Sequence, residues 1–213
     1  MFCETNKISV IFHKIKVLNE ISINIETGKT TVIMGRNGSG KSTLLRCLNY
    51  LLDPTSGTLK HKFNSSFPML FQKPAIFHNT VQYNFEVLCK IKKMKPFLQW
   101  YRSFKLDKIC KKKINEISGG EKQKTYLSRI MSIDPEIIIM DEPNQNLDNE
   151  SNKKFIKLIS DEKKKNKTII LVSHDINFVK CIADKIILLD CGKVTFEGAA
   201  KNFFETQKKY YNF

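Results

Sequence analysis

Hydrophobic residues along the chain gather into short unbroken runs, separated by longer stretches in which apolar and polar residues mix. Runs of Ile, Leu and Val without alternation are typical of strands covered on both faces of a parallel sheet. The mixed stretches between them predict helices. We therefore expect an α/β fold with a mostly parallel core sheet. The predicted buried strands are residues 31–34, 137–141, 168–173 and 185–189.

Three further segments predict elements outside this core. Residues 21–25 alternate strictly between isoleucine and polar residues, which predicts a half-exposed antiparallel strand. Cys191 and Gly192, followed by residues 193–196, predict a closing hairpin. Residues 80–115 are helical in pattern and basic, with Pro96 expected to open a second helix. This last segment is our candidate for a small subdomain.

Composition limits the class of protein. The 213 residues correspond to one domain, and the net charge is +15. Such a charge is compatible with nucleic acid, a membrane surface or a phosphate-rich ligand, and equally with solvated lysines in a Lys-rich chain. The six cysteines form no CxxC pair, which argues against a zinc motif and favours a reduced chain. We expect neither a signal peptide nor a membrane span, because the apolar runs fall far short of ~20 residues.

The strongest local motif lies directly after the predicted strand 31–34. Residues 35–43 read GRNGSGKST and match the phosphate-loop pattern G-x-x-x-x-G-K-[ST]. Its glycines let backbone N–H groups converge on phosphate oxygens, and the following helix adds its positive dipole end. Lys41 can reach the β- and γ-phosphates, and the Ser42 hydroxyl can bind Mg²⁺. The expected nucleotide-binding residues here are Gly35, Asn37, Gly38, Ser39, Gly40, Lys41, Ser42 and Thr43.

Two acids end the predicted strand 137–141. Ligand sites of parallel sheets lie at the carboxyl ends of strands, so Asp141 and Glu142 are expected to face the phosphate loop. Asp141 suits the Mg²⁺ shell. Glu142 suits a general base that activates water for attack on the γ-phosphate. The alternative is an acid pair that merely ends a strand.

Residues 117–123, ISGGEKQ, resemble the signature motif of the ATP-binding cassette (ABC) ATPases. Ser118, Gly119 and Gly120 lie where a helix could begin, which provides a second phosphate-binding N-terminus. In that family the signature meets the ATP held by the partner's phosphate loop. The resemblance therefore implies a head-to-tail dimer with a second ABC ATPase subunit, a homodimer in our expectation.

Other positions follow the family's order. Gln72 resembles the Q-loop glutamine, which is implied to sense Mg²⁺ and the γ-phosphate. His174 resembles the switch histidine, and Asp148, in residues 144–148, resembles the D-loop aspartate at the dimer seam. Phe12 occupies the place of the aromatic that stacks on adenine, and the alternative is a core aromatic beside Ile11.

The resemblance runs from about residue 8 to residue 198 and implies the architecture of the whole chain. We expect a single P-loop NTPase (ABC ATPase) domain over residues 1–213, with a RecA-like core of about 1–79 and 116–213. A helical signature subdomain of about 80–115 and a short antiparallel β arm complete it. No catalytic position is lost, so we expect an active ATPase that uses ATP and Mg²⁺.

The implied function is the ATP-hydrolysing subunit of a membrane transporter. Expected partners are transmembrane permease subunits and a substrate-binding protein, with no nucleic acid, and the expected location is cytoplasmic, at the inner face of the cell membrane. Overall likeness favours an importer for an oxyanion such as tungstate, although an importer for amino acids or metals, or a small exporter, would share these features. Residues 90–113 hold ten basic residues against one acid, which could face anionic lipid or be a solvated helix face. The alternative function is a soluble ABC ATPase acting on nucleic acid or ribosomes.

Overall fold

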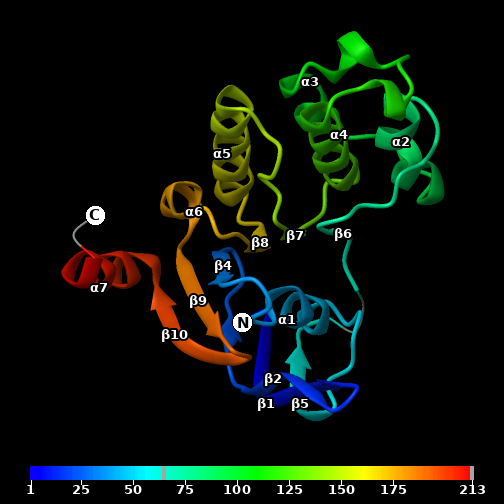
Figure 1. The fold of residues 1–213 in the computed structure, drawn as a ribbon. Helices are drawn as coiled ribbons and strands as arrows, with labels where there is room; N and C mark the ends of the chain where they lie inside the picture. The colour runs from blue at the N-terminus through cyan, green and yellow to red at the C-terminus, as the bar shows by residue number, and fades with distance from the viewer. Residues whose placement is uncertain (64–65, 212–213) are drawn as a thin grey trace.

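The computed structural model describes residues 1–63 and 66–211. Its centre is a six-stranded sheet whose neighbouring strands β9, β4, β8, β7 and β6 run parallel, with β10 antiparallel at one edge (Figure 1). In spatial order the strands are β10 (Lys193–Ala199), β9 (Lys185–Asp190), β4 (Thr30–Gly35), β8 (Thr168–Val172), β7 (Ile137–Asp141) and β6 (Met69–Leu70).

All four core strands expected from the sequence are present. β7 has the predicted bounds, and β4, β8 and β9 differ from theirs by one residue at one or both ends. Every residue of β7 and β8 is buried, because both faces of the sheet are covered. Successive side chains enter different cores: Ile169 and Leu171 belong to one hydrophobic cluster, Ile170 and Val172 to the other. The continuous apolar runs therefore reflect a sheet sandwiched between two layers.

Different elements cover the two faces. Helix α1 (Lys41–Leu48) and the antiparallel strands share a core with one face. Helices α4 (Gly119–Met131), α5 (Asn149–Lys164) and α6 (Ile176–Ile182) share a core with the other, and α4 and α5 rise from the sheet into the upper part of the molecule (Figure 1). Helix α7 (Ala200–Tyr211) follows β10.

A second, antiparallel sheet forms the β arm. Strand β1 (Cys3–Phe12) pairs with β2 (Ile15–Ile21), β3 (Asn24–Ile25) and β5 (Ser56–His61). The prediction of one strand over residues 21–25 is wrong, since residues 22 and 23 interrupt it. The Thr5 hydroxyl causes the break: it donates to Ile21 O (3.1 Å) and accepts from Ile23 N (3.0 Å), which replaces ladder bonds.

The predicted closing hairpin is confirmed as β9 and β10. Its turn residues, Cys191 (φ 44°) and Gly192 (φ 75°), are both left-handed, as a tight two-residue hairpin turn requires. A Cβ on Gly192 would lie 2.5 Å from Val17 O, so the turn also needs glycine in order to approach β2.

The helical lobe contains α2 (Val81–Ile91), α3 (Gln99–Ser103) and two single 3₁₀ turns at Leu106–Ile109 and Ile114–Glu116. Thr80 caps α2, accepting from Tyr83 N at 3.1 Å. The prediction that Pro96 opens the second helix is wrong, since α3 begins at Gln99. The Phe97 N–H instead donates to Ser132 O (2.7 Å), which holds the residues after Pro96 against the end of α4.

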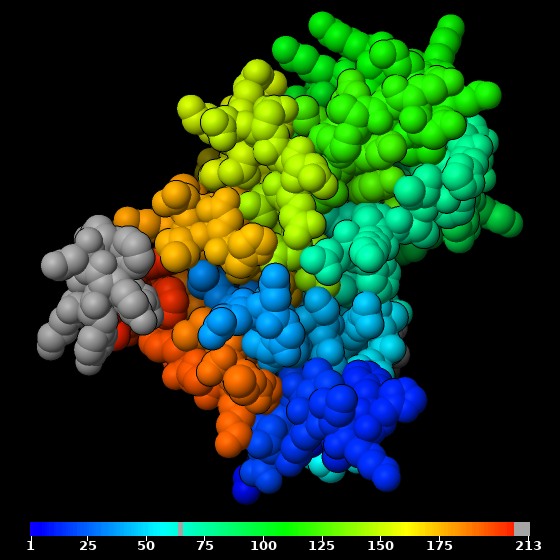
Figure 2. All heavy atoms as spheres, viewed as in Figure 1, coloured from blue at the N-terminus to red at the C-terminus, as the bar shows by residue number. Residues whose placement is uncertain are grey.

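Helix α4 lies beyond the predicted boundary at residue 115 yet packs against α2 and α3. The three helices make up the upper right of the molecule (Figure 1) and form a lobe that projects beyond the sheet (Figure 2). The boundaries of 80–115 remain a prediction. Within the described part of the chain, no helix combines the length and the apolar character needed to cross a membrane.

A buried charged group ties this lobe to the core. The Trp100 indole N–H donates to the Glu162 carboxylate at 3.1 Å, and both side chains are fully buried. Lys165 (3.2 Å) and Lys167 (2.7 Å) pair with the same carboxylate. Because a buried carboxylate is costly unless paired and hydrogen-bonded, this arrangement holds α3 against the end of α5.

We predict that Trp100→Phe destabilises the protein by about 1–3 kcal/mol, since it removes a hydrogen bond to a buried carboxylate. Tyr101→Phe is the control, because the neighbouring Tyr101 hydroxyl is buried and has no hydrogen-bond partner among the described residues. Its loss should change stability little. Equilibrium unfolding in urea measures both variants, and equal losses would contradict the role of the Trp100–Glu162 bond.

Candidate functional site

The phosphate loop joins β4 to α1 and contains three glycines with left-handed backbone. Gly35, Gly38 and Gly40 have φ values of 143°, 80° and 98°. Gly40 is the N-cap of α1 and supplies no side-chain cap, so the first N–H groups of the helix are left for a ligand. A Cβ on Gly40 would also lie 2.9 Å from Val17 O. The loop therefore leaves its N–H groups accessible to an anion and has no room for a side chain at Gly40.

Lys41, the first residue of α1, is 7% exposed. Its ammonium donates to Arg36 O at 2.9 Å, across the phosphate loop. It forms no ion pair with any carboxylate in residues 1–63 or 66–211. A buried ammonium held only by a carbonyl is suited to bind an anion, and phosphate matches this requirement.

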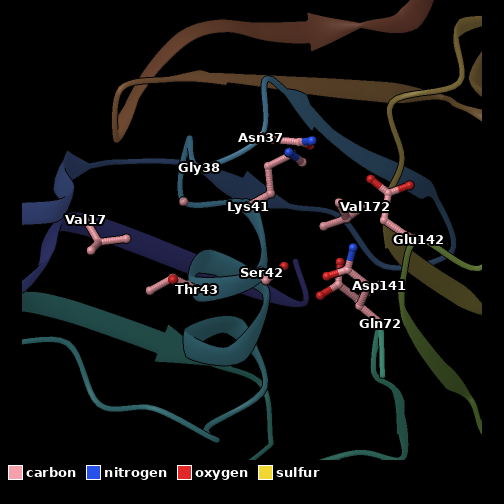
Figure 3. A pocket seen from close by; sticks show the side chains of 11 residues that line it. Val17, Asn37, Gly38, Lys41, Ser42, Thr43, Gln72, Asp141, Glu142 and Val172 are labelled. Carbon is pink, nitrogen blue, oxygen red and sulfur yellow. The ribbon is translucent and has the colours of Figure 1, made fainter. Parts of the chain in front are cut away.

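A cavity of about 290 Å³ lies over the loop. Figure 3 shows Lys41, Ser42, Asp141 and Gln72 directed toward the same space, with Glu142 beside them. Four features predicted from the sequence therefore meet at this cavity: the phosphate loop, Gln72, Asp141 and Glu142. The residues that line the cavity are Val17, Asn37, Gly38, Gly40, Lys41, Ser42, Thr43, Gln72, Asp141, Glu142 and Val172.

Several buried oxygens at this site have no hydrogen-bond partner among the described residues. At the cavity these are Asp141 Oδ1 and Glu142 Oε2, and Ser39 Oγ is a third such oxygen in the phosphate loop, outside the cavity lining. Buried polar atoms are nearly always paired in proteins, so unpaired ones at a cavity indicate a polar ligand. Hydroxyl, carboxylate and amide oxygens from Ser42, Asp141 and Gln72 are the hard donors that Mg²⁺ prefers. The residues present thus fit a nucleotide with its metal ion.

Burial raises the pKa of Asp141 above its ordinary value, while Ser42, Arg46 and Lys41 act to lower it. The raised pKa means that ionisation of this carboxyl is disfavoured by the loss of water around it. A bound divalent cation would reverse that preference, because it favours the charged form.

Glu142 begins the segment after β7 in a left-handed conformation (φ 50°), which is uncommon for a residue with a side chain. Its N–H donates to Val172 O (3.0 Å) at the end of β8. His174, just beyond β8, places Nδ1 2.8 Å from Glu142 Oε1. The structure therefore brings the predicted general base and the predicted switch histidine into direct contact, with the histidine 62% exposed and the glutamate 6%.

The signature residues lie outside this cavity. Ser118 caps α4, accepting from Glu121 N (3.2 Å), while the Glu121 carboxylate accepts from Ser118 N (2.8 Å). This reciprocal capping lowers the pKa of Glu121. A Cβ on Gly120 would lie 2.9 Å from Asn146 O, so the signature packs closely on the D-loop of the same chain.

Asp148 also lies outside the cavity. It caps α5, accepting from Ser151 N at 2.8 Å, and pairs with Lys124 of α4 at 3.3 Å. The hydrogen bonds from Ser151 lower the pKa of Asp148 to about 2. The capping role was not anticipated from the sequence, although an aspartate before a helical stretch is a common cap signal.

Phe12 does not line the cavity. It ends β1 and is 43% exposed, and the apolar residue at the cavity from this sheet is Val17 of β2. The sequence gave no signal for Val17, because a valine beside Leu18 in an edge strand is ordinary. The adenine-stacking role of Phe12 stays a prediction.

Two polar side chains of α4 were missed from the sequence. The Gln123 amide donates to Pro143 O at 2.7 Å, next to Glu142. The Arg129 guanidinium, 6% exposed, donates to Ala75 O at 3.0 Å, and burial lowers its pKa. Their places on the inner face of α4 were the only available signal. Through them α4 contacts the segments that follow both Glu142 and Gln72.

The fold and site together define a P-loop nucleotide hydrolase. Residues 18–145 match the family model described as ABC transporter. The chain belongs to the ABC transporter family and is one of its ATP-binding cassettes. This membership confirms the predicted ABC ATPase and its ATP-hydrolysing activity coupled to transport.

Curated relatives match nearly the whole chain. The arginine transport ATP-binding protein ArtM of Bacillus subtilis is 31% identical, over 96% of this chain and 94% of that protein. The methionine import ATP-binding protein MetN of Clostridium tetani is 32% identical, over 94% and 70% respectively. The energy-coupling factor transporter ATP-binding protein EcfA2 of Staphylococcus aureus is 31% identical, over 91% and 77%.

Solved structures confirm the fold. A dimeric post-hydrolysis structure of the ATP-binding cassette MJ0796, bound to ADP and Pi, has a TM-score of 0.83 at 24% identity, over 92% of this chain and 98% of that chain. An ATP-binding subunit of an ABC transporter has a TM-score of 0.86 at 19% identity, over 97% and 93%.

We predict that Asp141→Asn stabilises the nucleotide-free protein while abolishing ATP hydrolysis. The raised pKa of Asp141 means that the ionised carboxyl costs folding free energy at neutral pH, and the amide removes that cost. The melting temperature should rise by a few degrees at neutral pH. The difference should shrink as the pH falls through the ordinary carboxyl range, where the wild-type group is neutral in both states. A lower melting temperature for the variant at neutral pH would contradict this account.

Proposed function

We propose that the chain is the Mg²⁺-dependent, ATP-hydrolysing subunit of an importer and works as a dimer beneath separate membrane subunits. The observation that carries this is the convergence of Lys41, Asp141 and Glu142 on one cavity. Ser42, Asp141 and Gln72 would hold the Mg²⁺ ion, which when bound would offset phosphate charge.

The chemistry assigned to the chain's own residues follows from their positions. Lys41 and the N-terminus of α1 bind the phosphates and stabilise their charge. Glu142 takes the proton from the attacking water. His174 holds the Glu142 carboxylate in the nucleotide-free protein and, being largely exposed, is free to turn and donate to the γ-phosphate.

The position of the signature supports catalysis by two chains. Ser118, Gly119 and Gly120 belong to α4 and do not line the cavity of their own chain. Their helix N-terminus is a phosphate-binding group without a phosphate site beside it. A second copy, placed head to tail, would bring it to the partner's nucleotide. The packing of the signature on Asn146 would then set Asp148 at the dimer seam.

The membrane partner is assigned to the segment after Gln72. Ile76 (50% exposed) and Phe77 (38%) are large apolar residues of this segment, and Phe71 (37%) lies directly before Gln72. We place the coupling contact of the transmembrane permease here, with the chain peripheral on the inner face of the cell membrane. Gln72 would link that contact to the nucleotide.

Import is favoured by the relatives ArtM and MetN, whose names state arginine transport and methionine import. An importer would also use a substrate-binding protein. The ATPase subunit does not touch the cargo, so tungstate or another oxyanion stays a prediction from overall likeness. Amino acids are the second cargo class to test, by uptake of labelled compounds into vesicles that contain the assembled transporter.

We predict that Glu142→Gln keeps ATP binding but slows hydrolysis by ~10²–10⁴, because it removes the general base. Lys41→Ala is the matched comparison and should lose binding itself. Nucleotide binding and phosphate release, measured on the same preparations, distinguish the two. Wild-type turnover of the Glu142 variant would overturn the assignment. Hydrolysis stimulated by RNA or DNA, without any membrane partner, would favour the soluble alternative.

We predict that Ser118→Arg leaves ATP binding to each chain nearly normal and abolishes hydrolysis, since the arginine would obstruct the partner's γ-phosphate. Mixing it with Lys41→Ala should restore activity, because each mixed dimer pairs an intact loop with an intact signature. The assay is phosphate release by each variant and by the mixture. A Ser118→Arg protein that hydrolyses ATP normally would show that the signature does not act across chains.

A further inference from the structure

The far end of α2 carries an exposed tip of mixed basic and apolar residues. Residues 90–95 read KIKKMK, and all six are exposed. Ile91, at 71%, has the largest exposed fraction of any large apolar side chain in the described residues, and Met94 is 42% exposed. Moving exposed aliphatic side chains out of water lowers the free energy. A solvated lysine surface therefore does not account for the exposed Ile91 and Met94.

The charge of the tip is almost uncompensated. Of its four lysines, only Lys90 pairs with a carboxylate in the part of the chain that the structure describes, Glu86 at 3.4 Å. Lys92, Lys93 and Lys95 flank Ile91 and Met94 on both sides. The two exposed apolar residues are therefore interspersed with lysines along the tip.

Backbone hydrogen bonds to the last turn of α2 hold the tip in place. Lys92 N donates to Leu88 O and Met94 N to Cys89 O, both at 3.0 Å. Lys93 adopts a left-handed conformation (φ 52°) that reverses the chain. Cys89 is buried, and its thiol contacts Ser132 at 3.2 Å. Binding through the tip would thus order few additional residues.

One side of α2 connects this tip to the segment assigned to the membrane partner. The Phe77 ring meets the Tyr83 ring edge-on at 6.1 Å, and the Lys90 ammonium lies 4.9 Å above the Tyr83 ring. Helix α2 lies at the outer side of the helical lobe, and the surface there is exposed (Figures 1 and 2). A chain of side-chain contacts, from Phe77 through Tyr83 to Lys90, therefore links that segment to the tip.

We propose that the α2 tip, residues 90–95, binds the anionic phospholipid surface beside the membrane subunits. Ile91 and Met94 enter the boundary between headgroups and acyl chains, and the lysines pair with lipid phosphates. Only the continuity with Phe77 rests on the proposed function. A nucleic-acid site is disfavoured, because the tip offers neither an aromatic ring nor an arginine on which a base could stack.

The test is co-sedimentation of the full chain with two kinds of vesicles, phosphatidylcholine alone and phosphatidylcholine mixed with phosphatidylglycerol. The wild type should bind the anionic vesicles and not the neutral ones. Lys92→Glu/Lys93→Glu and Ile91→Ser/Met94→Ser should each weaken binding at least ~10-fold. Lys153→Glu/Lys157→Glu, on the exposed face of α5, makes the same change in net charge and should bind like the wild type.

Equal weakening by the α5 control would overturn the proposal, since net charge alone would then govern binding. Undiminished binding by the Ile91/Met94 variant would overturn it too, as would tip-dependent binding to polyadenylate RNA that matches or exceeds binding to vesicles. All variants should retain wild-type ATP hydrolysis. Loss of vesicle binding with intact hydrolysis therefore distinguishes this proposal from the proposed function.

Discussion

The parallel pairing of β7, β8 and β4 is the constraint on which the site depends. In register, Asp141 lies beside Val172 and Val172 beside Ile33, so the carboxyl ends of the three strands meet at one edge of the sheet. The phosphate loop follows β4, Glu142 follows β7, and His174 lies just beyond β8. A register slip by one residue would move every side chain of these strands into the opposite core and displace the residues that follow the strands. The packing of the sheet therefore also sets the relative positions of the site residues.

The site itself is held in states that are unfavourable without a ligand. Lys41 is buried with no carboxylate partner among the described residues, Asp141 is buried with a raised pKa, and Glu142 has a left-handed backbone. Each is a local cost that the surrounding sheet and helices overcome. A nucleotide with its metal ion would supply the missing partners. The same packing keeps the signature away from this cavity, where Ser118 caps α4 and lies against the D-loop.

Much of the architecture could be predicted, because continuous apolar runs define buried strands and the phosphate loop defines its own turn. The prediction failed where tertiary hydrogen bonds decide local structure: the Thr5 hydroxyl interrupts residues 21–25, and Phe97 bonds to α4 instead of continuing from Pro96. The sequence did not indicate that Val17 lines the cavity or that Arg129 bonds to the segment after Gln72, because an edge-strand valine and a helical arginine are ordinary in sequence.

We propose that one chain holds only half of a catalytic site, because its nucleotide cavity and its signature are each completed by the other chain of a head-to-tail dimer. The most direct test is the specific rate of ATP hydrolysis by the isolated wild-type chain as its concentration is varied at saturating ATP. We expect the specific rate of ATP hydrolysis to rise with protein concentration and to reach a plateau when all chains are dimeric. A specific rate that stays constant down to concentrations at which sedimentation detects only monomer would contradict it.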